Sequence, residues 1–181
     1  MKKLLLLTSV LAWISGVSAE EKPKLIVGVV ISHFYPEWMD MYGNELSENG
    51  LKRVMKQGTR VNVNYNYFYT QTGVDHASIY TGMLPTEHGI VSRAWYDRLR
   101  RKRQYSTQSD RYTEIGDQQA DSIKSLSPDY LQTMSLGSAM KWNNPMSRVF
   151  SVAMNGDEAV LSGGSSADMA IWFSEKTGKW V

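Results

Sequence analysis

The amino-acid sequence predicts an α/β fold with a largely parallel central sheet. A continuous apolar run at 25–31 has the length and composition of a parallel strand that is covered on both faces. From Val61 to Tyr67, apolar or aromatic residues alternate with asparagines, which is the period of two typical of a strand. Helical patterns separate these and later candidate strands. Strands that alternate with helices favour a sheet of parallel strands.

The first 19 residues have the features of a secretion signal. Lys2 and Lys3 precede an apolar stretch over 4–14, and the small residues Val17-Ser18-Ala19 predict cleavage before Glu20. The apolar stretch is short for a membrane span, although an uncleaved anchor is the alternative interpretation. We therefore expect residues 20–181 to be one exported domain, located in the bacterial periplasm and without a later membrane span.

Charge and cysteine content narrow the function classes. Of the 20 Lys and Arg residues, Lys2 and Lys3 belong to the expected signal, which leaves 18 basic and 18 acidic residues. This balance gives no general support for nucleic-acid binding. The chain has no cysteine, which excludes disulfide bonds and zinc sites built from thiolates.

The elements of the N-terminal half begin at recognisable signals. Pro36 is typical of a helix start, and Asn49-Gly50 separates this helix from a second one that ends near Gly58. The expected elements are strands at 25–31 and 60–69 and helices at 37–48, 51–58 and 73–83.

In the C-terminal half, Ser127-Pro128 predicts a helix start, with an N-cap residue followed by a first-turn proline. The expected elements are a hairpin of 94–96 with 103–106, a polar surface loop at 107–125, a helix from 127 to 143, strands at 148–154 and 169–173, and a helical turn at 157–161. The last strand turns through Gly178 into a short arm at 179–181. A short aromatic-rich strand without a further neighbouring strand is an exposed sheet edge, which proteins normally avoid. We therefore expect a truncated copy of a longer domain.

The order of several short motifs resembles bacterial alkaline phosphatases with a threonine nucleophile, close to the type I phosphodiesterase/nucleotide pyrophosphatase branch of the alkaline phosphatase superfamily. The matching motifs are Leu25–Ile31, Thr70-x-Thr72, His76-Ala77-Ser78-Ile79-Tyr80-Thr81-Gly82, Pro85-x-x-His88-Gly89-Ile90, Trp95-Tyr96-Asp97, Ser127-Pro128 and Phe173-x-x-x-Thr177-Gly178-Lys179. The resemblance implies the N-terminal part of a three-layer sandwich with a largely parallel sheet.

The resemblance also implies a site in which two zinc ions activate a threonine for phosphoryl transfer from small phosphate esters. Thr72 matches the nucleophile, which also contacts zinc, although the same residue could merely cap the following helix.

Three positions differ from the family pattern. Ser32 stands where the family has a metal-binding Asp, and Arg93 stands where it has a phosphate-contacting Asn. Asn155-Gly156-Asp157 aligns with a Lys-x-Arg pair that holds phosphate, and 151–167 contains no Lys or Arg. A carboxylate in place of a cation disfavours an anion. We expect an altered or inactive site and zinc not held by this chain alone.

The histidines and two biased segments have competing interpretations. His76 lies four residues after Thr72, so a Thr–His dyad is conceivable, but the resemblance favours structural roles for His76 and His88. His33 is a weak metal candidate. The basic run Arg98–Arg103 suggests either anion binding or, as favoured here, a solvated hairpin tip. Ser162–Ser166 lacks the ending of a phosphate loop and is expected to be a connector.

Three functions remain open at this point. The favoured one is an exported phosphatase-like protein with an inactive or altered site. The alternatives are an active zinc-dependent phosphomonoesterase or phosphodiesterase that uses Thr72, and a gene fragment without independent function.

Overall fold

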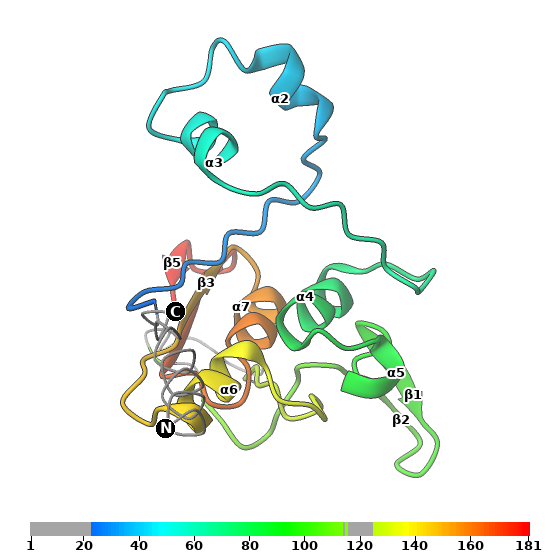
Figure 1. Cartoon of the computed structure of the whole chain (residues 1–181). Coiled ribbons are helices and arrows are strands. Elements are labelled where there is room, and N and C mark those ends of the chain that lie inside the picture. Colours follow the sequence, from blue (N-terminus) through cyan, green and yellow to red (C-terminus); the bar gives the residue numbers. More distant parts are fainter. Residues whose placement is uncertain (1–22, 114, 116–124) are drawn as a thin grey trace, which may run out of the picture. The chain divides into compact units, whose positions relative to one another are not determined.

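The computed structural model describes residues 23–113, 115 and 125–181, so the expected secretion signal lies outside the described residues. The chain divides into two compact units, Met1–Asn62 and Val63–Val181, and each is described by itself (Figure 1). Within the described ranges, no helix is long and apolar enough to cross a membrane.

In its described residues, the first unit has the short helices α2 (Glu37–Tyr42) and α3 (Leu51–Gln57). Helix α2 is shorter than the helix expected over 37–48, because Gly43, a poor helix former, follows its last residue. Helix α3 confirms the expected second helix and ends at Gly58.

The two strands expected at 25–31 and 60–69 are wrong. Neither segment pairs with another segment in the described part of the chain. Their apolar side chains are largely exposed, with Leu25 at 78% and Val61 at 71%. A strand requires a neighbour that supplies its hydrogen bonds, so an apolar or alternating composition does not create one by itself.

The second unit contains a three-stranded sheet of β3 (Phe150–Ala153), β4 (Met169–Ser174) and β5 (Lys179–Trp180), in that order. Strands β3 and β4 are parallel, and β4 and β5 form an antiparallel hairpin. These pairings confirm the last two expected strands and the turn through Gly178, whose φ of +68° suits glycine.

Two helices form the core beside this sheet. Helix α7 (Gly156–Gly163) connects β3 to β4 and packs against both, and it is longer than the helical turn expected at 157–161. Helix α4 (Thr72–Thr81) lies against α7 (Figure 1) and confirms the expected helix. The buried apolar residues of this core are Val74, Ala77, Ile90, Val160 and Leu161.

Helix α6 (Leu136–Asn143) begins later than the expected start at Ser127-Pro128. The Ser127 hydroxyl does accept the Asp129 N–H at 3.2 Å, but this contact closes only a turn. The Ser127 N–H pairs with the Thr107 carbonyl of another segment at 2.7 Å. Ser135 is the actual N-cap, and its hydroxyl accepts a hydrogen bond from the Ser138 N–H. The expected end near residue 143 is confirmed.

The remaining elements are the short helix α5 (Pro85–His88) and the expected hairpin of β1 (Ala94–Asp97) with β2 (Lys102–Tyr105). Of the surface loop expected at 107–125, residues 114 and 116–124 lie outside the described residues. The described part forms no helix or strand, as expected, but Thr107, Ser109 and Ser125 are buried and not at the surface. Gln108 forms an antiparallel bridge with Leu126, and the buried hydroxyls have hydrogen-bond partners.

Candidate functional site

Thr72 is the first residue of α4, and its side chain is exposed. Gln71 before it is extended, with φ −144° and ψ 147°, so the chain turns into the helix at Thr72. The N–H groups of a first helical turn have no partners within the helix, and the helix dipole is positive there. A threonine hydroxyl at this position therefore faces a local environment that favours an anion.

A pocket of about 460 Å³ surrounds the start of α4. It lies where β3 ends, because the turn from β3 into α7 supplies one of its walls. The carboxyl end of a parallel strand is a common place for a ligand site. The lining residues are Gln71, Thr72, Gly73, Arg93, Leu126, Asn155, Gly156, Asp157 and Glu158. We refer to it below as the Thr72 pocket.

The basic and acidic residues of the Thr72 pocket pair with each other. The Nε atom of Arg93 lies 3.4 Å from Oδ2 of Asp157, and the Thr107 hydroxyl donates to Oδ1 of the same carboxylate. The Arg93 backbone N–H donates to Oε1 of Gln71 at 2.7 Å. The structure thus brings Thr72, Arg93 and Asp157 to one pocket, as the sequence predicted, but with the Asp157 carboxylate already against the guanidinium.

Among the described residues that line this pocket, Arg93 is basic, and Asp157 and Glu158 are acidic. Glu158 also accepts a hydrogen bond from the Asn155 side chain at 2.7 Å. An incoming phosphate would therefore meet two carboxylates and one cation that already has a counter-ion. Like charges about 4 Å apart repel by roughly 1 kcal/mol in water and more where water is excluded.

His76 contacts Ser162 and not Thr72. Its Nδ1 atom lies 2.8 Å from the Ser162 hydroxyl oxygen, and its ring stacks on Tyr80. Burial lowers the pKa of His76. The conceivable dyad with Thr72 is not formed, since the contacts of the described residues include no hydrogen bond between these two side chains.

His88 is fully buried between two partners. The Ile90 N–H donates to its Nδ1 atom at 3.1 Å, so Nδ1 is unprotonated, and Nε2 donates to the Ser78 hydroxyl at 2.9 Å. Burial lowers the pKa of His88, in keeping with a neutral ring. Both ring nitrogens are in use, so His88 holds the α4–α5 region together and offers no free metal ligand.

Zinc, which the resemblance implies, does not fit the donors that the structure describes. Over residues 23–113, 115 and 125–181, no group of three His, Cys, Asp or Glu residues is placed to hold a metal ion. In the Thr72 pocket, Asp157 is bound to Arg93 and Thr107. Ser32 and His33 are exposed residues of the first unit, and His33 has a positive φ of 55°.

Sequence reasoning missed Thr107 and Gln71 as members of the site. Thr107 lies in a polar stretch without a motif, and only the fold brings it to Asp157, 50 residues away along the chain. Gln71 lies between the two threonines of the Thr70-x-Thr72 motif, and that position was the available signal.

Two other predicted segments have the expected structural positions. The basic run Arg98–Arg103 occupies the tip of the β1–β2 hairpin, where Asp97 accepts hydrogen bonds from the Leu99 and Arg100 N–H groups. Ser162–Ser166 spans the end of α7 and the start of the connection to β4.

A family model described as type I phosphodiesterase / nucleotide pyrophosphatase matches residues 26–178. Alkaline phosphatase PafA of Elizabethkingia meningoseptica is 32% identical over 169 residues, which are 91% of this chain and 30% of PafA. Alkaline phosphatase PhoK of Sphingomonas sp is 31% identical over 161 residues, 88% of this chain and 28% of PhoK.

The crystal structure of wild-type PafA superposes with a TM-score of 0.79 at 29% identity, over 90% of this chain and 32% of PafA. This chain therefore has the α/β fold of alkaline phosphatases and corresponds to their N-terminal portion. It spans about a third of the length of the curated relatives it matches. From the extent of the family match, this chain belongs to the type I phosphodiesterase / nucleotide pyrophosphatase family.

Proposed function

We propose that this chain is an exported phosphatase-like protein with an altered Thr72 pocket that does not hydrolyse phosphate esters by itself. The observation that carries the proposal is the ion pair between Arg93 and Asp157, in which the chain's own carboxylate takes the place of an anionic ligand. The pattern of the first 19 residues supports export.

The Asp157 carboxylate is held in this place from two sides. Thr107 donates to one oxygen and Arg93 lies against the other, so phosphate has to displace a positioned group. The side chain of Asp157 is 23% exposed, whereas that of Arg93 is 74% exposed. The carboxylate is therefore the better shielded partner, and the exposed guanidinium has more freedom to turn outward.

Activation of Thr72 is the second difficulty. A free alcohol is a weak nucleophile at neutral pH and requires a base or a metal beside it. The nearest histidine along α4, His76, is committed to Ser162. Of the two carboxylates in the pocket, Asp157 is committed to Arg93 and Thr107, and Glu158 accepts a hydrogen bond from Asn155. Among the described residues, no group of His, Asp or Glu side chains is placed to hold the zinc pair that the resemblance implies.

One observation favours the alternative, an active hydrolase of small phosphate esters. Thr72 is exposed at the start of α4 and lines the same pocket as a guanidinium, which is where a nucleophile would lie. Any rate of hydrolysis that depends on Thr72 would support this alternative.

The deciding experiment compares the wild-type chain with Thr72→Ala on an aryl phosphate monoester and diester, with and without added zinc. Thr70→Ala is the matched control, since Thr70 is not among the residues that line the pocket. We expect the three proteins to hydrolyse each substrate at the same rate. Elemental analysis should find fewer than two zinc ions per chain. A rate lost only in Thr72→Ala would overturn the proposal.

A further inference from the structure

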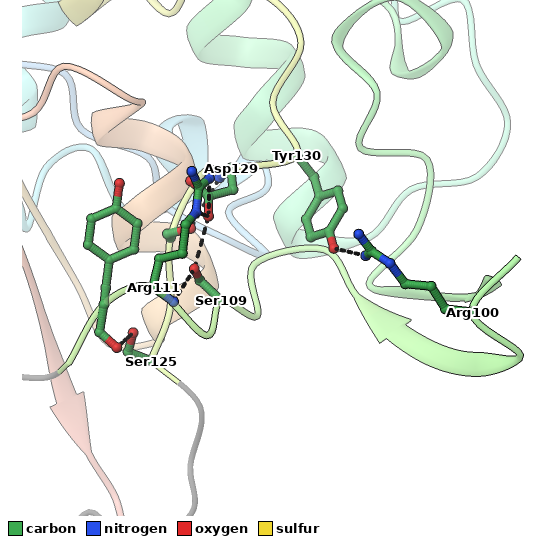
Figure 2. A network of polar contacts seen from close by, with 8 residues as sticks. Arg100, Ser109, Arg111, Ser125, Asp129 and Tyr130 are labelled. Carbon is green, nitrogen blue, oxygen red and sulfur yellow. Dashed lines mark hydrogen bonds and ion pairs between the residues drawn. The ribbon is translucent and has the colours of Figure 1, made fainter.

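A second pocket, of about 530 Å³, lies beside the tip of the β1–β2 hairpin. It shares no lining residue with the Thr72 pocket. Its charged lining residues are Arg100, Lys102, Asp110, Arg111 and Asp129. We call it the hairpin pocket. Figure 2 shows two of its contacts, Arg100 with Tyr130 and Arg111 with Asp129.

Arg100 and Lys102 share one nearby counter-charge, the carboxylate of Asp97. The Arg100 guanidinium is 3.8 Å from Asp97 and 3.4 Å from the Tyr130 hydroxyl, both long contacts. Lys102 stands opposite Asp97 in the hairpin, and its charge contributes to lowering the pKa of that carboxyl, but among the described residues its ammonium group makes no hydrogen bond. Most of the donor groups on these two side chains are therefore available to a ligand.

Arg111 contributes a third cation from a separate segment. Its Nη2 and Nε atoms lie 2.8 Å and 3.2 Å from the same oxygen of Asp129, which also accepts from the Ser109 hydroxyl (Figure 2). This carboxylate oxygen is saturated by three donors and fixes the position of the guanidinium. Among the described residues, the Nη1 group of Arg111 makes no hydrogen bond or ion pair.

Tyr130 adds a neutral donor at the same place. It accepts the hydrogen bond from Arg100, so its own hydroxyl hydrogen is left to donate. Its ring is held edge-on against Trp95 at 5.4 Å between centroids, which makes this wall rigid. Asp110 also lines the pocket and has an interaction of its own.

We propose that the hairpin pocket binds an anion that carries two phosphate groups. Guanidinium and ammonium groups are the usual ligands of phosphate oxygens. The pocket has three cations, Arg100 and Lys102 on the hairpin and Arg111 on the segment after it, against the two carboxylates of Asp110 and Asp129. Cations on two segments around a pocket of this volume suit two linked phosphates better than one. Two linked phosphates occur in a free diphosphate and in a lipid headgroup. The same cations of the pocket would bind either one.

The test is calorimetric titration of the full chain with inorganic pyrophosphate, and with orthophosphate for comparison, in metal-free buffer. We expect pyrophosphate to bind at least about tenfold more tightly than orthophosphate. Binding should weaken by about tenfold or more in Lys102→Gln and in Arg100→Gln with Lys102→Gln. Lys102→Gln removes no hydrogen bond within the described residues, only an exposed cross-strand charge interaction with Asp97, so its fold should be unchanged.

Two variants serve as matched controls. Arg103 belongs to the same basic run, but its guanidinium lies over the Tyr105 ring at 5.3 Å and does not line the pocket. Arg93 lines the Thr72 pocket. Arg103→Gln and Arg93→Gln should bind pyrophosphate as the wild type does.

A parallel sedimentation with phosphatidylcholine vesicles, with and without cardiolipin, distinguishes the source of the phosphates. Retention on cardiolipin vesicles that Lys102→Gln abolishes assigns a lipid headgroup, and pyrophosphate binding without such retention assigns a free ligand. The proposal is overturned if neither probe binds, if orthophosphate binds as tightly, if Arg103→Gln has the same effect as Lys102→Gln, or if only Arg93→Gln abolishes binding.

Discussion

The Nε2 atom of His88 lies 2.9 Å from the hydroxyl oxygen of Ser78, and both side chains are buried where α4 meets α5. The Ile90 N–H donates a hydrogen bond to the other ring nitrogen, Nδ1, so a proton on Nδ1 would break that hydrogen bond. The neutral ring is therefore part of the folded structure.

This relationship predicts that the chain loses stability in acid. Burial lowers the pKa of His88 and of His76 below the ordinary value of 6.5, so the unfolded state binds protons first as the pH falls. Their contribution is complete above about pH 6.5 and is lost as the pH falls through the folded-state pKa values. Urea unfolding at pH 7.5 and pH 5 should show a smaller free energy of unfolding at pH 5.

His88→Asn and His76→Gln should each reduce this pH dependence, whatever their effect on stability at neutral pH. His33→Asn is the control, because His33 is exposed and asparagine tolerates its positive φ. An unchanged pH dependence in both buried-histidine variants would contradict the prediction.

Asp157→Asn should strengthen phosphate binding in the Thr72 pocket by about tenfold. The substitution removes the carboxylate charge beside Arg93 but keeps an oxygen for the Thr107 hydroxyl. Calorimetric titration with orthophosphate measures the change. Arg93→Gln added to Asp157→Asn should remove the gain.

Glu158→Gln is the matched control for this prediction, because Glu158 lines the same pocket but contacts Asn155 and not Arg93. Its effect on phosphate affinity should be clearly smaller. Equal gains from the two substitutions would show that general charge, and not the ion pair, limits binding.

Leu161→Ala should lower the free energy of unfolding by about 2–5 kcal/mol, because Leu161 is fully buried between α7 and α4. Leu99→Ala removes the same atoms at a side chain that is 96% exposed, and should cost less than about 0.5 kcal/mol. Chemical denaturation of both variants tests the pair. Similar losses of unfolding free energy in the two variants would contradict the prediction that the buried contact between α4 and α7 stabilises the core.

Gly164→Ala should destabilise the chain more than Gly178→Ala. Both glycines have a positive φ, of 74° and 68°, and a side chain at either position pays a backbone cost of about 1 kcal/mol or more. At Gly164, an added Cβ would also lie 2.6 Å from Ser135 Cβ, whereas nothing lies within 4 Å at Gly178. Thermal unfolding midpoints of the two variants measure the difference, and equal midpoints would contradict it.

Local sequence signals located the elements whose partners lie nearby. The β1–β2 hairpin, the β4–β5 hairpin and the start of α4 depend on residues close in the chain, and all three are confirmed. The strands expected at 25–31 and 60–69 failed because the pairing of a strand is decided by a neighbour. Ser127 does not begin a helix although its hydroxyl accepts the Asp129 N–H, because this local contact closes only a turn and the helix begins after Ser135.

The ordered motifs and the alternation of helices and strands predicted the family and the α/β class, and the resemblance to the family led us to expect Thr72, Arg93 and Asp157 at one site. Only the tertiary structure decided that Asp157 neutralises Arg93, that Thr107 holds this carboxylate, and that His76 and His88 have partners other than Thr72. The physical reason is that charge pairing and burial act over distances of a few ångströms in space, and the sequence order does not encode those distances directly.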